Sequence, residues 1–600
     1  MNKTTKFFAA FASVALMSAC SSEEPFVDGG AEDGTGNGQK AYLAVTINST
    51  GDMGMGRSTD YEKPLYEDGA EFEHKVDCAS FFFFDEEGNW VTSVEPNYAP
   101  SFGEDDPVND NIEYMSTKNI LVLEGLKGNK YPTYMLTVLN MEDFTAESTL
   151  AATTQKLSVY ADNFKKENGK NVQNFVMSTS AYFGENANHD NKYYNVTKLN
   201  ESNFKLTADE AQNNSPVDVY VERLAAKVQL TVNAPTEEIN GKEFYVIEQT
   251  IAGGDNSNGT SGDGLANTKV YLEVVGWGLN STAIDSYVGK QLKADWATTN
   301  PFTSWQSVDR YRSFWAYSRA YEGGANLDNY LSYTNIPALT TPASLDYAEY
   351  CYENTNAPEN IYQQNNAGQK LVVNSKVTHV VLRTKLYNAN GEVQNIVEYR
   401  GVPYLEDTFK AYLLNSLKNS TKGLNYYYLA DSKTEGDATV TDYTQVDVKD
   451  IAFVGKEGYE KVDIVLADAA KALYKKTVNE EGEVKFVKLE GADNDLAARL
   501  TAFQGDTPLI WHNQGTNLYF IPVEHNATAA NKDKEGYYGV VRNHWYKISV
   551  NKFSKLGHGA YDPDDATIII KPDTPEDPLY YVGAKINILN WRIISQNVEL

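Results

Sequence analysis

The side chains that could carry out catalysis are not arranged in any known catalytic pattern. The seven histidines include no HExxH motif and no group with the spacing of metal ligands. The chain has no Walker-type phosphate loop, no GxGxxG before a helix and no GxSxG elbow. Carboxylates are abundant, but a glycoside hydrolase needs two of them close in space, which a sequence does not reveal. We therefore expect no enzyme activity, no metal and no cofactor, with structural or surface roles for His74, His189, His379, His512, His525, His544 and His558.

The first reactive position is the thiol of Cys20. Residues 1–20 begin with lysines, continue through an apolar run and end in small residues before this cysteine. The run is too short for a permanent membrane-spanning helix and has the layout of a secretory signal. Ser18, Ala19 and Cys20 together resemble the lipobox of bacterial lipoproteins, in which the cysteine receives a diacylglycerol and becomes the new N-terminus. The alternative is an ordinary signal with a chance cysteine.

The second reactive position is the peptide bond between Arg57 and Ser58. It lies in the glycine-rich stretch STGDMGMGRSTDYEKP, and exposed loops of small residues are where proteases cut. Arg57 suits a trypsin-like or Arg-specific protease, whereas Lys63 is followed by Pro64, which such enzymes usually reject. The alternative is that Arg57 is only a solvated surface charge.

The element before this loop is a predicted strand over residues 41–48. Leu43, Val45 and Ile47 alternate with other residues and fall on one face, which predicts a strand with one buried side. Residues 25–40 are rich in glycine and acidic side chains and predict a flexible tether.

The last element, within residues 578–600, is a second apolar strand on a stiff arm rich in proline and acidic residues. Its apolar side chains alternate, and the parity changes once: the first set is Val582, Ala584, Ile586 and Ile588, and the second is Leu589, Trp591 and Ile593. Such a strand either folds back as the last strand of its own sheet or adds a strand to another molecule.

The body of the chain predicts a mostly β protein with two or more domains and a few short helices. A chain of 600 residues is too long for one core, and short runs of Val, Ile, Thr, Tyr and Phe alternate with Gly, Asn and Asp. We expect one amphipathic helix over 146–166 and a strand pair over 219–235. The expected segments are a signal (1–20), a tether with the removable strand (21–57), an N-terminal domain (58–235), a C-terminal domain (236–570) and an arm with the last strand (571–600).

Composition also limits the possible partners. The formal net charge of -30 opposes binding to nucleic acid and favours a soluble surface. The aromatic stretch at 305–321, with Trp305 and Trp315, fits a sugar platform or, more simply, core packing. Cys78 and Cys351 are either a disulfide pair or two buried free thiols.

The order of these features resembles a fimbrillin of the Bacteroidales minor-fimbria (Mfa-type) major subunit family, a structural subunit of type V pili. The features in order are the lipobox, the first strand with its arginine loop, VERLAAKVQLTV, DRYRSFWAYS, VVRNHWYKISVNKFSKLG, the Asp/Pro arm and KINILNWRIISQNVEL. The SSEE after the lipobox resembles the tag that directs lipoproteins of the Bacteroidota to the outer face of the outer membrane.

The resemblance implies two β-sandwich-like (transthyretin-like) domains and assembly by donor-strand exchange. The precursor would be a lipoprotein of the cell outer membrane in which strand 41–48 fills a groove. Cleavage after Arg57 would release this strand, and the last strand of another copy would then enter the groove to form an extracellular fimbrium that supports adhesion and biofilm formation. The implied partners are further copies, anchor and tip subunits and the protease. The alternatives are a tip or accessory adhesin and a surface glycan-binding lipoprotein.

Overall fold

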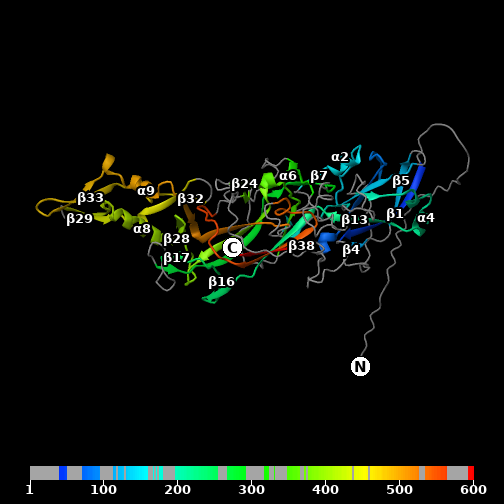
Figure 1. The fold of residues 1–600 in the computed structure, drawn as a ribbon. Helices are drawn as coiled ribbons and strands as arrows, with labels where there is room; N and C mark the ends of the chain where they lie inside the picture. Colours follow the sequence, from blue (N-terminus) through cyan, green and yellow to red (C-terminus); the bar gives the residue numbers. More distant parts are fainter. Residues whose placement is uncertain are drawn as a thin grey trace, which may run out of the picture.

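The computed structural model is an elongated, mostly β protein with a few short helices (Figure 1), which confirms the predicted fold class. The structure describes residues 39–50, 71–94, 112–115, 119–126, 130–159, 166–167, 170–171, 175–179, 196–253, 266–291, 316–322, 330–331, 347–364, 370–372, 376–435, 438–456, 460–525, 534–563 and 592–599. The signal, the tether, the arginine loop and the arm lie outside these residues.

The N-terminal sheet has the strand order β12-β1-β13-β10-β6-β2-β3, with β4 and β5 also paired to β1 and β11 paired to β6. Its strands are β1 (Gln39–Thr50), β2 (Ala79–Phe84), β3 (Trp90–Val94), β4 (Ile112–Met115), β5 (Asn119–Leu126), β6 (Tyr134–Leu139), β10 (Met177–Thr179), β11 (Thr197–Lys198), β12 (Phe204–Lys205) and β13 (Val217–Arg223).

Both faces of this sheet are covered. Side chains alternate along a strand, so Phe81 and Phe83 of β2 enter one apolar cluster, while Phe82 and Phe84 enter another. All of them are fully buried. The run of four phenylalanines is therefore a strand between two cores.

The next two sheets form the middle of the molecule and share one apolar core. The four-stranded sheet has the order β23-β14-β37-β38, and the five-stranded sheet has the order β15-β16-β19-β26-β36. Their strands are β14 (Ala225–Val232), β15 (Thr236–Ile239), β16 (Lys242–Val246), β19 (Tyr271–Asn280), β23 (Ala348–Tyr352), β26 (His379–Tyr387), β36 (Thr516–Pro522), β37 (His544–Lys552) and β38 (Arg592–Glu599).

The end opposite the N-terminal sheet carries a seven-stranded sheet, β18-β17-β28-β27-β35-β32-β31, and a four-stranded sheet, β30-β29-β33-β34 (Figure 1). The strands are β17 (Ile251–Ala252), β18 (Asn267–Thr268), β27 (Ile396–Tyr399), β28 (Val402–Leu405), β29 (Tyr427–Glu435), β30 (Ala438–Gln445), β31 (Ile451–Gly455), β32 (Lys461–Leu466), β33 (Leu473–Val478), β34 (Val484–Lys488) and β35 (Leu509–His512).

Short elements complete the described fold. The two-stranded pairs are β7 (Leu157–Val159) with β21 (Asp285–Tyr287), β8 (Lys166–Glu167) with β9 (Lys170–Asn171), β20 (Thr282–Ala283) with β22 (Tyr330–Leu331), and β24 (Tyr362–Gln364) with β25 (Lys370–Val372). The α-helices are α1 (Glu71–His74), α2 (Leu150–Thr154), α4 (Ala208–Asn213), α6 (Arg319–Glu322), α7 (Pro358–Ile361), α8 (Glu406–Lys418) and α9 (Leu496–Gln504). The 3-10 helices are η1 (Glu201–Asn203), η7 (Val448–Asp450), η8 (Gly491–Asp493) and η9 (Asn513–Gly515).

Two local expectations differ from the structure. The predicted helix over 146–166 is wrong, because α2 ends at Thr154 and the chain continues as β7, which pairs with β21 of a distant segment. Strands do occupy 219–235, but β13 and β14 are not paired with each other. The chain changes sheet at the single residue Leu224, so β13 joins the N-terminal sheet and β14 pairs with β23 and β37.

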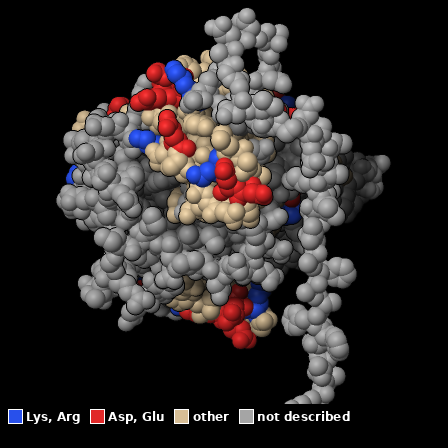
Figure 2. Space-filling view, turned by 90° about the vertical axis from the view of Figure 1, so that its right-hand side faces the viewer, with Lys and Arg blue, Asp and Glu red and all other residues tan. Residues whose placement is uncertain are grey.

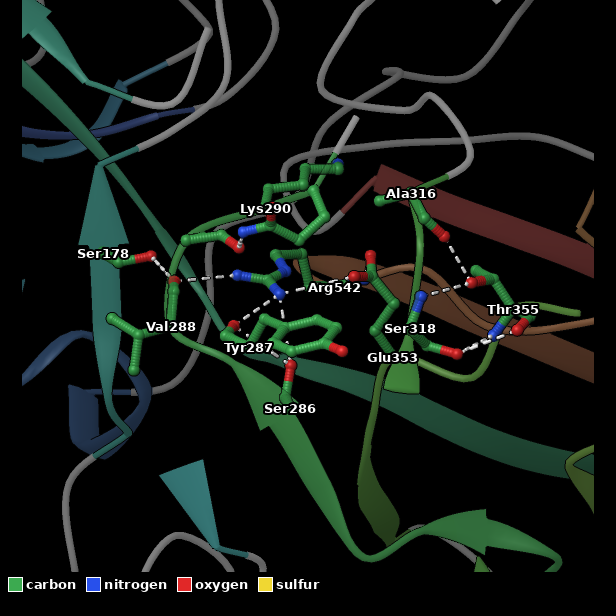
Figure 3. A network of polar contacts seen from close by, with 12 residues as sticks. Ser178, Ser286, Tyr287, Val288, Lys290, Ala316, Ser318, Glu353, Thr355 and Arg542 are labelled. Carbon is green, nitrogen blue, oxygen red and sulfur yellow. Dashed lines mark hydrogen bonds and ion pairs between the residues drawn. The ribbon is translucent and has the colours of Figure 1, made fainter. Parts of the chain in front are cut away.

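A buried polar network joins these sheets (Figure 3). Arg542, which is 1% exposed, donates to the carbonyl oxygens of Val288 (3.2 Å) and Tyr287 (2.8 Å) and forms an ion pair with Glu353 at 3.3 Å. Ser178 of β10 donates to the same carbonyl of Val288. The guanidinium therefore ties the segment before β37 to β21 and, through Val288, to the N-terminal sheet.

We expect the variant Arg542→Met to lower the free energy of unfolding by about 3–5 kcal/mol, because it leaves the buried carboxylate of Glu353 without its cation. Urea unfolding followed by tryptophan fluorescence measures the effect. The control is Lys75→Met, since Lys75 and Asp77 form a surface pair with both side chains 59% exposed; its loss should change stability by less than about 1 kcal/mol. Equal effects of the two variants would contradict a structural role for the network.

Candidate functional site

The first strand, β1, lies inside the N-terminal sheet with partners on both edges. Its residues Val45–Ser49 pair in parallel with Val217–Val221 of β13. Its other edge pairs antiparallel with β5 and then with β4. Near its start, Tyr42 and Leu43 also pair with β12. Among the described residues, β1 therefore provides backbone hydrogen-bond partners for β4, β5, β12 and β13, which do not pair with one another.

The side chains of β1 also contribute to the core. Ala41 and Leu43 are fully buried and belong to the same apolar cluster as Leu121 of β5, Phe204 of β12 and Val219 of β13. Removing β1 would open a groove bounded by unpaired strand edges and floored by these apolar groups.

The predicted strand over 41–48 is thus present and extends from Gln39 to Thr50. Leu43 is buried as its alternation predicted. The backbones of Val45 and Ile47 pair with Val217 and Val219, whereas their side chains lie outside the described residues. That β1 is removable stays a prediction. The lipidation residue Cys20 and the cleavage residues Arg57 and Ser58 also lie outside the described part of the chain.

The segment that follows the arginine loop is fixed independently of β1. Glu73 of α1 is fully buried and pairs with Lys227 of β14 at 2.9 Å. Tyr350 of β23 donates its hydroxyl to the same carboxylate, and Arg223 Nε donates to the backbone oxygen of Glu73 at 2.6 Å. Beside this carboxylate, burial raises the pKa of the Tyr350 phenol. The chain downstream of residue 70 is therefore attached to both sheets through α1.

The last strand, β38, has a different position from β1. It is the outermost strand of the order β23-β14-β37-β38 and pairs in parallel with β37. Ile593 is opposite Trp545, and Val598, which is 2% exposed, reaches the central apolar core. In this structure the end of the chain folds back as an edge strand of its own sheet, one of the two alternatives that the sequence allows.

Most of the proposed donor residues precede β38. Val582, Ala584, Ile586, Ile588, Leu589 and Trp591 lie outside the described residues, and the backbone of Ile593 is within β38. Among the described residues, β1 and β38 belong to different sheets and are not brought together. Their roles remain predictions.

The described residues contain no group of three or more His, Cys, Asp or Glu side chains that could hold a metal ion. Cys78 and Cys351 are separate buried thiols, and burial raises the pKa of each, which keeps them protonated. Over the same part of the chain, no helix combines the length and apolar character needed to cross a membrane. Trp305 and Trp315 fall outside the described ranges.

Sequence inspection missed the buried charges that fix α1 and the sheets. Glu73, Lys227 and Arg542 are charged residues, which ordinarily lie at the surface. The available signal was their context, because Lys227 lies within the apolar run LAAKVQL and Arg542 follows GVV. A charge inside an apolar strand indicates a buried partner.

The fold and these terminal strands define a mostly β protein in which one end strand is central to a sheet and the other lies at an edge. Residues 511–597 match the family described as "Major fimbrial subunit protein type IV, Fimbrillin, C-terminal". The match covers the C-terminal region only, and there it supports the resemblance of this chain to the fimbrillins. A fimbrillin is a subunit of a cell-surface fimbria and assembles with other fimbrial subunits.

Solved structures with weak similarity are also fimbrial proteins. A fimbrilin from Porphyromonas gingivalis has 10% identity and a TM-score of 0.32, covering 93% of this chain and 96% of its own. The tip fimbrial protein Mfa3 from Porphyromonas gingivalis has 12% identity and a TM-score of 0.24, covering 68% and 99%. A fimbrial assembly protein from Parabacteroides distasonis has 13% identity and a TM-score of 0.25, covering 59% and 89%. No curated protein matches the chain.

We expect Leu43→Ala to lower the free energy of unfolding of the N-terminal sheet by about 2–5 kcal/mol, because it leaves a cavity in the core. Hydrogen exchange of the β5 and β13 amides measures the change in this sheet. Val122→Ala is the control, since Val122 lies on the neighbouring strand β5 but is 41% exposed, and its effect should stay within about 0.5 kcal/mol. Unchanged protection in Leu43→Ala would show that β1 does not stabilise the sheet.

Proposed function

We propose that this chain is a non-enzymatic shaft subunit of a fimbria that polymerises by donor-strand exchange. The exported precursor carries a lipid on Cys20 and is anchored in the cell outer membrane. A trypsin-like or Arg-specific protease cuts after Arg57, and Ser58 becomes the N-terminus of the subunit. The last strand of another copy then replaces β1.

The observation that carries this proposal is the position of β1. It pairs on both edges and buries Leu43, yet it precedes the arginine loop, and the chain after the loop is held separately by Glu73. A cut between these attachments leaves β1 bound only by noncovalent contacts. The downstream body keeps its own contacts.

The vacated groove would favour a longer replacement strand. An eight-residue segment such as 41–48 covers about 26 Å, whereas residues 582–593 could cover about 40 Å. Each fully buried Val, Ile or Leu contributes roughly 1.5–3 kcal/mol before entropy costs. A donor with more apolar residues would therefore displace β1 and leave only slowly.

The donor segment 582–593 overlaps the start of β38, which among the described residues pairs only with β37 at the edge of its sheet. An edge strand leaves its sheet without separating two other strands, so the donor can be withdrawn together with β38. Detachment exposes Val598 and the hydrogen-bonding edge of β37, and binding to another copy compensates for this loss. Since groove and donor are different surfaces, the contact is head to tail and produces an open filament.

We expect trypsin to convert the precursor to a chain that begins at Ser58 and then forms a ladder of polymers. Arg57→Ala removes the cut and should leave the protein monomeric. N-terminal sequencing and gel electrophoresis without boiling measure both steps. Lys63→Ala is the control, because the Lys63–Pro64 bond is a poor substrate, and it should polymerise normally. A chain that is cut at Ser58 and stays monomeric would contradict strand exchange.

Deletion of residues 579–600 should abolish the ladder and leave a folded monomer. The fold should persist because β38 is an edge strand, although loss of buried Val598 should reduce stability by roughly 1.5–3 kcal/mol. Circular dichroism during thermal unfolding and ladder formation are the two readouts. Loss of the folded state would show that the last strand is indispensable to its own body.

A further inference from the structure

The sheet β30-β29-β33-β34 exposes an apolar face at the end of the molecule opposite β1 (Figure 1). Tyr443 stacks on Phe486 with ring centroids 4.2 Å apart, and Tyr427 and Tyr474 contact the same pair of rings. These four rings are only partly buried. We name this surface the distal face.

Register assigns further residues to the distal face. Tyr474, Lys476 and Val478 of β33 are opposite Lys488, Phe486 and Val484 of β34. Val478 is 62% exposed and Val484 is 50% exposed. Lys476 is exposed, and among the described residues it has no acidic partner. An exposed apolar patch bordered by charge typically marks a protein contact.

The end that carries β1 has complementary properties. Leu206, between β12 and α4, is 62% exposed, and Val122 of β5 is 41% exposed. Asp209 and Glu210 follow Leu206 and are exposed on α4. Figure 2 looks at this end and shows acidic side chains, with some basic side chains among them, beside uncharged surface. The distal face therefore combines exposed valines with a lysine, and the end that carries β1 combines an exposed leucine with carboxylates.

We propose that the distal face of one copy packs against the Leu206 surface of the next copy along the filament. This inference rests on the proposed function, because head-to-tail polymerisation brings opposite ends of neighbouring subunits together. A donor strand also tethers the two ends at high effective concentration, so a small contact is sufficient for binding. The occupant is a second copy rather than a glycan, because the distal face exposes the aliphatic residues Val478 and Val484 and the opposite end carries carboxylates that can pair with Lys476.

Cysteine cross-linking of the assembled, processed full chain tests the contact. The double variant Val478→Cys with Leu206→Cys should give disulfide-linked multimers on a denaturing, non-reducing gel after mild oxidation. The matched control is Val487→Cys with Leu206→Cys, since Val487 is 45% exposed on the neighbouring strand β34 but points to the opposite face of the sheet. The native Cys78 and Cys351 are buried and should not react.

Charge exchange provides the second readout. Lys476→Glu in the cysteine pair should reduce cross-linking about two- to fivefold, and adding Glu210→Lys should restore it.

Ladders without cross-linking above the control would overturn the contact and leave the polymer intact. Absence of ladders in the wild type would overturn the polymer and this contact with it. Binding of the monomer to immobilised carbohydrate that Val478→Asp abolishes would assign the distal face to a glycan instead.

Discussion

The parallel pairing of β1 with β13 is the contact on which the N-terminal sheet depends. Val45–Ser49 and Val217–Val221 form this ladder, while the other edge of β1 serves β4 and β5. Buried backbone N–H and C=O groups are nearly always hydrogen-bonded, so an extended strand in the place of β1 stabilises this sheet. These hydrogen bonds need a strand in this position, but they do not need that strand to be covalently joined to the downstream chain.

The buried ion pairs would hold the sheets of the downstream chain together if β1 were lost. Glu73 with Lys227 fixes α1, and Arg542 with Glu353 fixes the segment before β37. Removing one partner of such a pair is costly, because the remaining charge stays buried. None of these four residues belongs to β1. The loss of β1 therefore opens one groove while the junction between the sheets keeps its bonding.

Local patterns in the sequence predicted the elements better than their partners. The alternation through Leu43 identified a strand correctly, because a strand that is buried on one face carries apolar residues at every second position. The expected helix at 146–166 failed because the pairing of Ser158 with Ser286 is a long-range contact that periodicity does not encode. Leu224 divides two sheets without any turn residue. The anchoring role of Glu73 depends on Lys227, which is distant in the sequence, and no local pattern predicts this contact either.

The two terminal strands differ in how their sheets hold them, and this difference gives a physical basis for the direction of exchange. β38 has a ladder on one side with β37, whereas β1 has ladders on both sides. For equal lengths, the edge strand loses fewer hydrogen bonds on leaving, and the central position offers more on entry. A strand that moves from an edge to a vacated central position therefore gains backbone pairing as well as apolar burial. In the proposed exchange, a cleaved β1 returns to the groove only by a bimolecular step, so a terminal strand with more apolar residues competes with it on equal kinetic terms.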